Sequence, residues 1–526
     1  MSNSPHLSPL TPLSFLERSA LVWATRTAVV DGPRTFTYAE HAERVARAAG
    51  ALLELGVIPG DRVATLIPNR SAMLELTYAV PWMGAVLVPL NTRLSGQEYA
   101  YILAHSGARV VIADRSLAAP LEAALGLIAE PPTVVWVAES ADDSPYDKQL
   151  DGATPSVRVV PDDENALLSI NYTSGTTGQP KGVMTTHRGA YMQALGVIAD
   201  SALTSSSSYL WTLPMFHCNG WCYPWAVTAM GAKHVCLPVF RPAMVWEIFD
   251  KQHITHMCGA PTVVTMLLAD ESAARLKAPV RVVVGGAPPS PTLLERAADL
   301  NIDVVHMYGL TETYGPLAVC AWNPAWDSLS PSKQATLRAR QGVGTVISER
   351  VRVVDDAMAD VPPDASTLGE VVMRGNNVML GYYRDAAATA EAFRGGWFHS
   401  GDVGVVHPDG YIELHDRIKD IVISGGENIS SIEVEQALVS HPAVVEAAVV
   451  GAPHESWGEV PIAFVTITDN VEPDELRLHV RERLAHFKVP ARIEIVRELP
   501  KTSTGKIQKF VLRERAHTPS GNAKRL

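Results

Sequence analysis

The sequence predicts an α/β protein with a large N-terminal domain and a small α+β C-terminal domain. Three observations support this prediction. A chain of 526 residues is too long for a single hydrophobic core. Over the first half, short apolar runs alternate with helical stretches of about ten residues, which is typical of parallel strands joined by helical crossovers. Beyond residue 420 the alternation changes, and about a hundred residues form a separate mixed domain.

Local signals predict the first elements of the N-terminal domain. Thr37 and Glu40 form a capping box ahead of an apolar stripe at helical spacing, so a helix begins there. Gly60 and Asp61 then turn the chain into a strand at 62–67. The alternation continues with a helix over 72–80, a strand over 85–90, a helix over 97–105 and a strand over 108–113. This half is expected to supply scaffold and few chemical groups.

Further elements are predicted along the rest of the chain. A helix near 189–199 and a buried strand over 280–284 extend the α/β pattern, and Asp409-Gly410 predicts a tight hairpin turn. In the C-terminal domain, Ser430 and Glu433 form a second capping box. The elements predicted after it are a helix at 432–439, strands at 444–450, 462–467 and 492–496, and a helix near 475–486.

The composition excludes several classes of protein. The net charge of −12, spread without a long like-charge block, argues against a nucleic-acid-binding protein. Five cysteines, an odd number, argue against a disulfide scaffold and for a reducing compartment. The N-terminus lacks a basic start followed by an apolar core, and no apolar run reaches about 18 residues. We therefore expect a cytoplasmic protein without a membrane span; the final Ala-Lys-Arg-Leu resembles a peroxisomal address only faintly.

The most informative stretch is N-Y-T-S-G-T-T-G-Q-P-K-G at 171–182, directly after an apolar strand. Its glycines let backbone N–H groups approach an anion, its hydroxyl groups can donate, and Lys181 adds a positive charge. The run therefore predicts a phosphate-binding loop. It differs from the loop of P-loop NTPases, because Gln179 and Pro180 separate the last glycine from the lysine. A flexible linker is the alternative, and the flanking strand and the further motifs argue against it.

Four further motifs contain groups suited to a nucleotide or to a hinge. In H-M-Y-G-L-T-E-T at 306–313, a tyrosine can stack on a base, a threonine can bind a phosphate, and a carboxylate near phosphates is best explained by Mg²⁺. Asp402 can accept hydrogen bonds from both hydroxyls of a ribose, or it can cap a turn. The charges of D-R-I-K-D at 416–420 are typical of an exposed connector between domains. P-K-T-S-T-G-K-I at 500–507 contains Lys506, which by default is a solvated surface lysine.

Aromatic and sulfur-containing residues gather in W-T-L-P-M-F-H-C-N-G-W-C-Y-P-W at 211–225. This segment is either plain core or one wall of an apolar pocket. Cys218 and Cys222 flank a turn beside His217, but no second Cys/His pair has the spacing of a metal site, so buried apolar cysteines are expected. The strand at 280–284 ends in G-G-A-P-P, a break that could admit a base or an acyl chain.

Together these motifs resemble the adenylate-forming superfamily of acyl-CoA synthetases, peptide-synthetase adenylation domains and luciferases, from about Phe36 to Lys509. Y-T-S-G-T-T-G-Q-P-K-G matches the signature loop of that superfamily at nearly every position, and P-K-T-S-T-G-K matches its terminal signature. The resemblance implies a small barrel-like β part in the N-terminal domain and a mobile C-terminal domain. The expected boundaries are 1–416 for the N-terminal domain, 417–420 for the hinge and 421–526 for the C-terminal domain.

The resemblance also implies site residues. Lys506 would bridge the carboxylate and the α-phosphate, Lys419 would be the hinge, and His217 would lie at the mouth of the acid tunnel. The catalytic set is Lys506, Glu312, His217, Lys181 and Lys419, and the metal-binding set is Thr173 and Glu312. The nucleotide and coenzyme A contacts are Thr173, Ser174, Gly175, Thr176, Thr177, Gly178, Lys181, Gly286, Ala287, Pro288, Met307, Tyr308, Thr311, Asp402, Arg417, Gly425 and Gly426. The acid pocket is Met215, His217, Trp221, Gly285 and Gly309.

The activity that the resemblance implies is that of an ATP-dependent acyl-CoA synthetase using ATP, Mg²⁺ and coenzyme A. It would form an acyl-adenylate, release pyrophosphate and pass the acyl group to coenzyme A after rotation of the C-terminal domain. The segment P-M-F-H-C-N-G-W-C and residues 322–341 favour short- and medium-chain acids, and bulky Trp221 favours a short tunnel. An aryl-acid CoA ligase of the benzoate or cinnamate type and a stand-alone adenylation enzyme that loads a carrier protein are the alternatives. A luciferase-like oxygenase and a nucleotide sensor are weaker ones, and a homodimer is left open.

Overall fold

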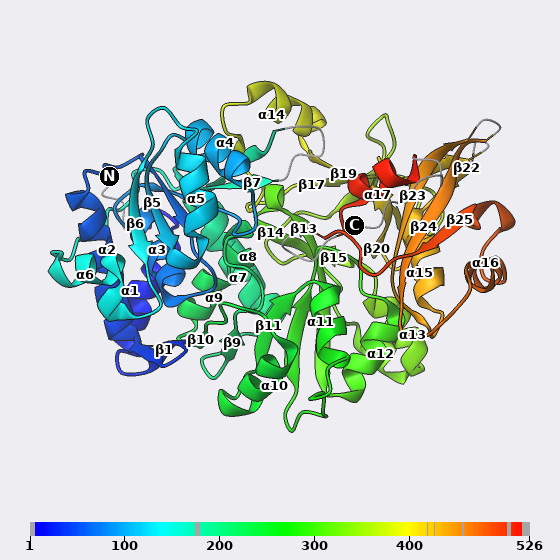
Figure 1. Cartoon of the computed structure of the whole chain (residues 1–526), viewed down its shortest axis with the longest axis horizontal. Helices are drawn as coiled ribbons and strands as arrows, with labels where there is room; N and C mark the ends of the chain where they lie inside the picture. Colours follow the sequence, from blue (N-terminus) through cyan, green and yellow to red (C-terminus); the bar gives the residue numbers. More distant parts are fainter. Residues whose placement is uncertain are drawn as a thin grey trace.

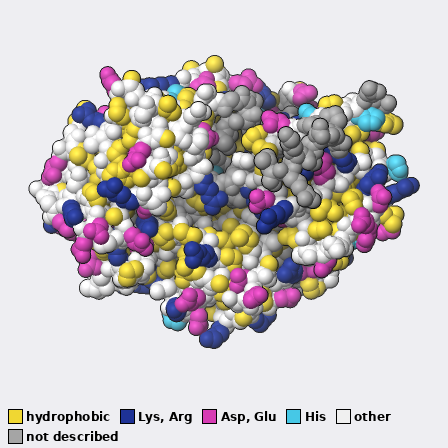
Figure 2. All heavy atoms as spheres, viewed as in Figure 1, with side chains coloured by type: hydrophobic (Ala, Val, Ile, Leu, Met, Phe, Trp, Pro, Cys, Tyr) yellow, Lys and Arg dark blue, Asp and Glu magenta, His cyan; other side chains and the backbone are white. Residues whose placement is uncertain are grey.

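The computed structural model describes residues 6–173, 179–417, 419–424, 427–454, 457–501 and 507–517. It confirms the α/β class, with a large N-terminal domain built on parallel sheets and a smaller C-terminal domain (Figure 1). Within these ranges, no helix combines the length and the apolar character that crossing a bilayer requires. Acidic and basic side chains are interspersed over the face shown in Figure 2, without a broad basic patch.

The first sheet has seven strands in the order β18-β8-β7-β4-β3-β5-β6. The strands from β7 to β6 are parallel, whereas β8 and β18 run antiparallel to their neighbours. Helices α2, α3 and α6 pack on one face and α4 and α5 on the other. The strands are β3 (Arg62–Leu66), β4 (Val86–Pro89), β5 (Ala108–Asp114), β6 (Thr133–Val137), β7 (Leu167–Thr173), β8 (Lys181–Thr186) and β18 (Gly381–Tyr382). The helices are α2 (Tyr38–Glu54), α3 (Ser71–Trp82), α4 (Gly96–Ser106), α5 (Ala118–Leu125) and α6 (Pro145–Gly152).

The second sheet has nine strands in the order β15-β14-β13-β12-β11-β9-β10-β1-β2, with antiparallel strands only at its two ends. Helices α1, α7 and α9 share one core with α2 and α3, so these helices lie between the two sheets, while α10 to α13 cover the other face. The strands are β1 (Thr27–Asp31), β2 (Arg34–Thr37), β9 (Ser208–Leu210), β10 (Lys233–Val235), β11 (His256–Gly259), β12 (Val280–Val284), β13 (Ile302–Leu310), β14 (Gly315–Val319) and β15 (Val343–Gly344). The helices are α1 (Leu13–Val22), α7 (His187–Ser201), α8 (Cys218–Trp221), α9 (Tyr223–Ala229), α10 (Pro242–Lys251), α11 (Pro261–Leu268), α12 (Pro291–Asp299) and α13 (Pro331–Arg338).

A third, antiparallel sheet follows where the barrel-like part was expected. Its order is β16-β17-β19-β20, and an isolated bridge between Gly342 and Ile412 joins it to the segment before β15. The hairpin between β19 and β20 turns at Asp409-Gly410, as predicted, and Gly410 has φ +83°. The elements are β16 (Arg352–Val354), β17 (Gly369–Met373), α14 (Ala386–Ala392), β19 (Phe398–Val406) and β20 (Ile412–Arg417).

The C-terminal domain is a five-stranded sheet, with β22-β21-β24-β23 in order and β25 parallel to β24. Helices α15 and α16 pack on one face and α17 on the other. It lies at the right of Figure 1. The elements are β21 (Val422–Ser424), β22 (Glu427–Ile429), α15 (Ser431–Val439), β23 (Val444–His454), β24 (Gly458–Ile467), α16 (Pro473–Arg481), β25 (Arg492–Ile495) and α17 (Lys509–Ala516).

The capping predictions differ in outcome. The first capping box is confirmed, because Thr37 Oγ1 accepts from the Glu40 N–H and the Glu40 carboxylate accepts from the Thr37 N–H. The second box is half formed: Ser430 accepts from the Glu433 N–H at 3.2 Å, but the Glu433 carboxylate binds Lys488 Nζ at 2.6 Å. A cation outcompetes a neutral N–H for that carboxylate.

The helix predicted near 475–486 ends at Arg481. It is shorter because the chain turns there to pack Leu484 and Val489 against the core of the C-terminal domain. The strand predicted at 444–450 is longer than expected and runs to His454.

Candidate active site

The candidate site lies at the carboxyl ends of β12 and β13, which are parallel neighbours, and this is the usual place for a ligand in an open α/β sheet. From β13, the Tyr308 hydroxyl donates to Asp402 Oδ2 at 2.5 Å, and Arg417 Nε lies 3.0 Å from Asp402 Oδ1. Asp402 and Arg417 are register partners on β19 and β20, so the hairpin holds both in place. The fold therefore brings three predicted nucleotide-binding residues, Tyr308, Asp402 and Arg417, into direct contact. Tyr308 and Asp402 are 94 positions apart in the sequence.

Tyr382 joins two further candidate residues. Its hydroxyl donates to Glu312 Oε1 at 2.9 Å, and Lys181 Nζ lies 4.8 Å from the centre of its ring. The backbone supports this arrangement, because the Met379 N–H donates to the Glu312 carbonyl at 2.7 Å. The sequence reasoning missed Tyr382, although G-Y-Y-R-D at 381–385 was a signal: two aromatic residues beside charges in a loop.

Glu312 suits a divalent cation. Burial raises the pKa of its carboxyl group, and the Tyr382 hydrogen bond and Arg417 only partly offset that effect. A raised pKa means that the negative charge lacks full compensation, which a bound cation would supply. Within the described ranges no three His, Cys, Asp or Glu side chains could hold a metal alone. Mg²⁺ is usually held by one or two carboxylates and the substrate phosphates, so a single glutamate fits such a site.

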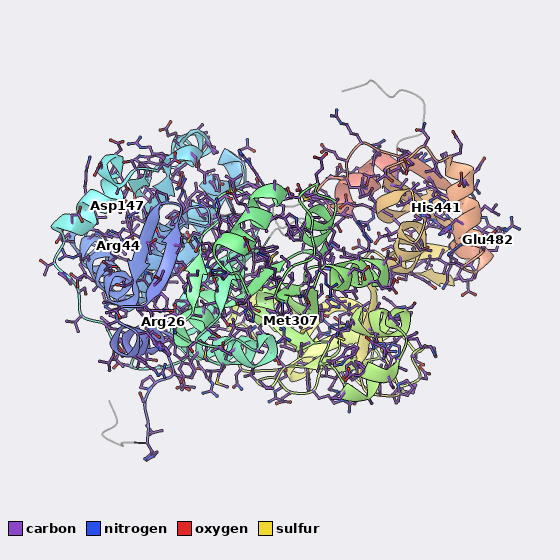
Figure 3. The ribbon with its side chains drawn as sticks, turned by 90° about the horizontal axis from the view of Figure 1, so that it is seen from below. Arg26, Arg44, Asp147, Met307, His441 and Glu482 are labelled. Atoms are coloured by element: carbon purple, nitrogen blue, oxygen red, sulfur yellow. The ribbon has the colours of Figure 1, made fainter. Side chains whose placement is uncertain are left out.

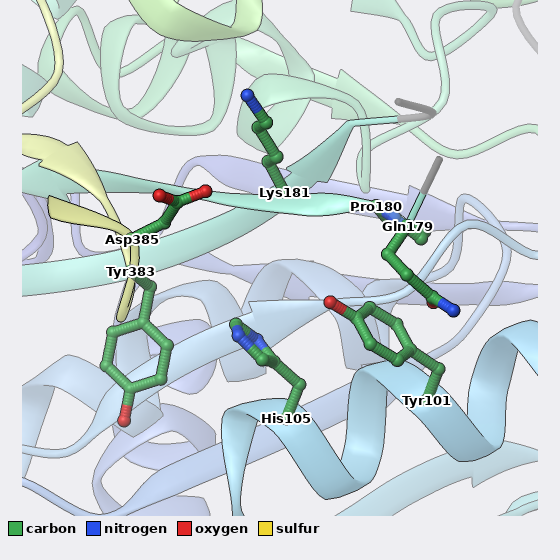
Figure 4. Close-up of a pocket in the computed structure, with 7 residues that line it drawn as sticks. All are labelled: Tyr101, His105, Gln179, Pro180, Lys181, Tyr383 and Asp385. Carbon is green, nitrogen blue, oxygen red and sulfur yellow. The ribbon is translucent and has the colours of Figure 1, made fainter. Parts of the chain in front are cut away.

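A pocket of about 270 Å³ lies beside Lys181 (Figure 4). Tyr101 and His105 line it from α4, Lys181 comes from the start of β8, and Tyr383 and Asp385 come from the segment after β18. Other lining residues are Gln179 and Pro180. His105 stacks on Tyr101 and accepts or donates a 2.7 Å hydrogen bond with Tyr172, so the aromatic wall is fixed.

Two of the acid-pocket candidates, Trp221 and Gly285, are in close contact. Trp221 is 6% exposed and lies against two glycines: a Cβ on Gly285 would come within 2.8 Å of its ring, and a Cβ on Gly315 within 3.3 Å of its side chain. Met215 and Met307 are buried in the core cluster that also contains Trp221. A side chain at Gly285 would therefore overlap the ring of Trp221, and one at Gly315 would crowd the Cα and Cβ of Trp221.

The other pocket candidates are Gly309 and His217. Gly309 packs so closely on the carbonyl of Gly315 that a Cβ would lie 2.0 Å from it. His217 is half-buried and precedes α8. Beyond Gly285, Gly286 has φ +84° with no atom within 4 Å of an added Cβ, so the break after β12 is open there, and Ala287 is exposed and Pro288 half-buried.

The segment labelled α8, with Cys222 after it, is a left-handed turn, because all five residues from Cys218 to Cys222 have φ between +46° and +65°. Left-handed residues normally occur singly, and each non-glycine residue costs roughly 1–2 kcal/mol in this conformation. The sequence predicted a turn between Cys218 and Cys222 but not its left-handed conformation, although the Asn219-Gly220 pair is typical of positive φ. The cysteines are buried and free, as expected, and Cys218 Sγ lies 3.5 Å from Thr311 Oγ1.

Asn219 anchors the left-handed turn in a buried polar network. Its side chain is fully buried; it accepts from Asn171 Nδ2 at 2.9 Å and donates to Ser169 Oγ at 3.1 Å and to the Tyr314 hydroxyl at 2.6 Å. Ser169 and Asn171 lie on β7, which leads into the phosphate loop. Tyr314 directly follows the 306–313 motif. The network thus ties the left-handed turn to both nucleotide motifs.

The charged connector makes specific contacts. Arg513 of α17 donates to the Lys419 carbonyl at 3.3 Å and to Asp420 Oδ1 at 2.6 Å. Burial opposes ionisation of Asp420, but Arg513, Lys509 and Lys419 lower the pKa of its carboxyl group. Lys419 is exposed as a whole, but partial desolvation of its amine lowers its pKa, an effect that the nearby Asp420 opposes. The connector is therefore held to α17, the last described helix, by one ion pair and one hydrogen bond, both from Arg513.

Several candidates lie outside the described residues. These are Lys506, Ser174, Gly175, Thr176, Thr177, Gly178, Gly425 and Gly426. Thr173 and Lys181, the register partners on β7 and β8, border the phosphate loop, and Lys501 and Ile507, which form an antiparallel bridge, border the loop of Lys506.

Comparison with known proteins agrees with these motifs. A family model described as AMP-binding enzyme matches residues 16–383, and one described as AMP-binding enzyme C-terminal domain matches 433–506. An acetate–CoA ligase of Humulus lupulus is 43% identical, over 98% of this chain and 96% of that protein. A peroxisomal trans-cinnamate:CoA ligase of Petunia hybrida is 40% identical, over 97% of this chain and 94% of that protein.

A solved structure shares the fold over nearly its whole length. It is the anthranilate CoA ligase AuaEII in complex with anthranoyl-AMP, with a TM-score of 0.86 and 27% identity, covering 98% of this chain and 99% of that chain. The chain therefore belongs to the AMP-binding enzyme family, on the acid–CoA ligase branch of the adenylate-forming superfamily that its motifs resemble.

Proposed function

We propose that the protein joins a short- or medium-chain carboxylic acid to coenzyme A, through an acyl-adenylate formed from ATP. The observation that supports the chain length is the position of Trp221, whose ring lies against Gly285 and is 6% exposed. A large, rigid side chain at this point leaves room for a short acyl chain and excludes a long one. The acetate–CoA ligase relative agrees with this choice.

In the first half-reaction, a carboxylate oxygen of the acid attacks the α-phosphorus of ATP, and the bond to the β-phosphate oxygen breaks. Two anions must approach each other, so the protein acts mainly by positioning and by neutralising charge. Lys181 and Lys506 supply positive charge, Asp402 and Arg417 hold the ribose, and Tyr308 holds Asp402 in place. Mg²⁺ at Glu312 and Thr173 would neutralise the phosphates that leave as pyrophosphate.

In the second half-reaction, the thiol of coenzyme A attacks the acyl carbonyl and AMP leaves with the former carboxylate oxygen. We propose that the C-terminal domain, residues 421–526, rotates about 417–420 to exchange the Lys506 loop for the Gly425-Gly426 loop. In support, the two family matches end at 383 and begin at 433, on either side of this connector. Arg513, which contacts Lys419 and Asp420, would have to follow the rotation.

Two substitutions separate the half-reactions. Lys506→Ala should abolish adenylation while thiolysis of a supplied acyl-adenylate survives. Lys419→Pro should slow thioester formation more than pyrophosphate exchange, because proline restricts the rotation of the hinge backbone. Equal loss of both half-reactions in Lys506→Ala would contradict the division of labour.

The experiment that tests the proposal is acid-dependent AMP release across a series of acids, with and without coenzyme A. A maximum between two and about eight carbons, with release stimulated by coenzyme A, is expected from the position of Trp221. A maximum at palmitate would contradict the proposal. Preference for benzoate or cinnamate would support the aryl-acid alternative, because a flat aromatic ring also fits a narrow pocket. The similarity to a trans-cinnamate:CoA ligase and to an anthranilate CoA ligase is consistent with this alternative.

Mass spectrometry of the products distinguishes coenzyme A from a carrier protein as the acceptor. Location in the cytoplasm and a homodimer remain proposals. Fractionation tests the first, since several relatives are named peroxisomal. Light scattering tests the second.

A further inference from the structure

The left-handed turn at 218–222 connects the two halves of the proposed site. Its first residue, Cys218, contacts Thr311 of the nucleotide motif, and Trp221, which the proposed function assigns to the acid pocket, lies against Gly285 and Gly315. Five successive residues with positive φ do not persist unless the surroundings hold them. Gly220 tolerates this backbone readily, but Cys218, Trp221 and Cys222 do not.

The side chain of Asn219 supplies the polar contacts that hold the turn from within. Its amide makes three hydrogen bonds, at 2.6–3.1 Å, to Asn171, Ser169 and Tyr314. These partners are themselves hydrogen-bonded. The Ser169 hydroxyl donates to Asn171 Oδ1 at 3.1 Å and lies 2.7 Å from the hydroxyl of Thr185. Rotation of the turn would leave several buried polar groups without partners, which is unfavourable.

The direction of the Trp221 ring depends on this backbone. A residue that changes from the left-handed to the right-handed region projects its side chain in a different direction, so the ring would no longer lie over Gly285 and Gly315. The pocket would then be deeper in the same place. Because β7 carries two of the anchors, the depth of the pocket is set relative to the strand that enters the phosphate loop.

We propose that Asn219 is a positioning residue that fixes the length of acyl chain the enzyme accepts, by holding the left-handed turn so that Trp221 closes the pocket. The inference rests on the proposed function, because it assigns the pocket to the acid. Asn219 does not touch the reacting atoms; it acts through Trp221 and through its hydrogen bonds to β7 and Tyr314.

The test uses two variants of the full-length protein. Asn219→Gly keeps a residue that accepts positive φ and removes the three amide contacts, whereas Tyr314→Phe removes one contact, at 2.6 Å. The matched control is Asn301→Gly, because Asn301 also has positive φ, +64°, and its amide donates to the Leu276 carbonyl at 3.1 Å, away from the site. Pyrophosphate exchange with acetate and with hexanoate gives the ratio of kcat/KM values.

Asn219→Gly is expected to lower the acetate-to-hexanoate ratio by about tenfold or more, the discrimination typical of a hydrophobic wall. Tyr314→Phe should lower it less, and Asn301→Gly not at all, while the Kd of ATP without acid stays constant. A folded Asn219→Gly with the wild-type ratio would overturn the inference, and Tyr314→Phe decides if that variant does not fold.

A second readout needs no turnover. Calorimetry gives the affinities of non-hydrolysable acetyl and hexanoyl sulfamoyl-adenosines, whose ratio should shift in the same direction. An unchanged ratio contradicts the role of Asn219. If the wild-type protein exchanges pyrophosphate with none of the acids, the proposed function is wrong instead. The two failures are therefore distinguishable.

Discussion

Two clusters of charged residues in the N-terminal domain differ in whether their glutamate is paired with a cation of the same chain. In the first, Arg44 Nε lies 2.6 Å from Glu75 Oε1, Arg44 Nη2 lies 2.7 Å from Asp147 Oδ1, and the Tyr146 hydroxyl donates to Glu75 at 2.8 Å. The Glu75 side chain is fully buried, and each of its oxygens accepts a hydrogen bond from Arg44. Figure 3 shows Arg44 and Asp147 far from Met307 at the site.

The second cluster is at the site itself. There Glu312 accepts from the neutral hydroxyl of Tyr382 rather than from a guanidinium, and burial raises the pKa of its carboxyl group. Asp402, in contrast, already has Arg417 at 3.0 Å. A buried carboxylate that holds a cation of the same chain serves the fold, whereas a half-buried one beside a neutral donor is ready for a cation brought by a ligand.

The largest expected effect concerns the first cluster and stability. Arg44→Met leaves Glu75 buried without its cation, while Asp147 keeps its ion pair with Arg34, so the free energy of unfolding should fall by about 3–5 kcal/mol. Denaturant titration measures this change. The Lys251→Met variant is the control, because the pair of Lys251 with Glu247 is exposed and should contribute only about 0.3–0.5 kcal/mol. Equal stability of the two variants would remove the contrast between the clusters.

Glu312→Gln should do the opposite, lowering activity without lowering stability. We expect acid-dependent pyrophosphate exchange to fall by about 100-fold or more, since a charge-stabilising group is removed from the transition state. Because the folded-state pKa of Glu312 is raised above its usual 4.5, the folded protein binds this proton more tightly, and stability falls as the pH rises from 4.5 through the folded-state pKa.

That sign predicts a melting temperature for Glu312→Gln at pH 7 equal to or above that of the wild type, with the difference vanishing below pH 4.5. Thermal melts of both proteins across this pH range measure it. A variant less stable than wild type at pH 7 would show that Glu312 serves the fold as Glu75 does.

The smallest effect separates positioning from charge within the site. Tyr308→Phe removes the 2.5 Å hydrogen bond to Asp402 but leaves Arg417 in place, so the KM of ATP should rise by about two- to tenfold. Tyr411→Phe is the control, because its hydroxyl donates to the Ala321 carbonyl at 2.8 Å outside the site, and its KM should not change. A rise of the same size in both variants would mean that the effect is structural.

Local signals account for what the sequence predicted correctly. The capping box of Thr37 and Glu40 spans three residues and needs no distant partner. The strand before the phosphate loop and the Asp409-Gly410 turn are local in the same way. The second capping box formed only in half, because the Glu433 carboxylate binds Lys488, which is 55 positions away and outside any local pattern.

The site shows the same limit. Single motifs identified Glu312, Tyr308 and Asp402 as candidates, but the contact between Tyr308 and Asp402 depends on the meeting of β13 with the third sheet. The left-handed turn could not be predicted from Asn219-Gly220 alone, because Ser169, Asn171 and Tyr314 stabilise it from elsewhere in the chain. Sequence gives the chemistry of each group, and the tertiary fold gives its partner.

The central claim is that the acid attacks the α-phosphorus of ATP in this site, and isotope transfer tests it most directly. With acetate labelled with ¹⁸O in both carboxylate positions, ATP and coenzyme A, the account predicts one ¹⁸O in the phosphate of each AMP released, because AMP leaves with the oxygen that attacked. Unlabelled AMP would contradict the claim, whether the ¹⁸O is found in another phosphate product or only in the acyl group.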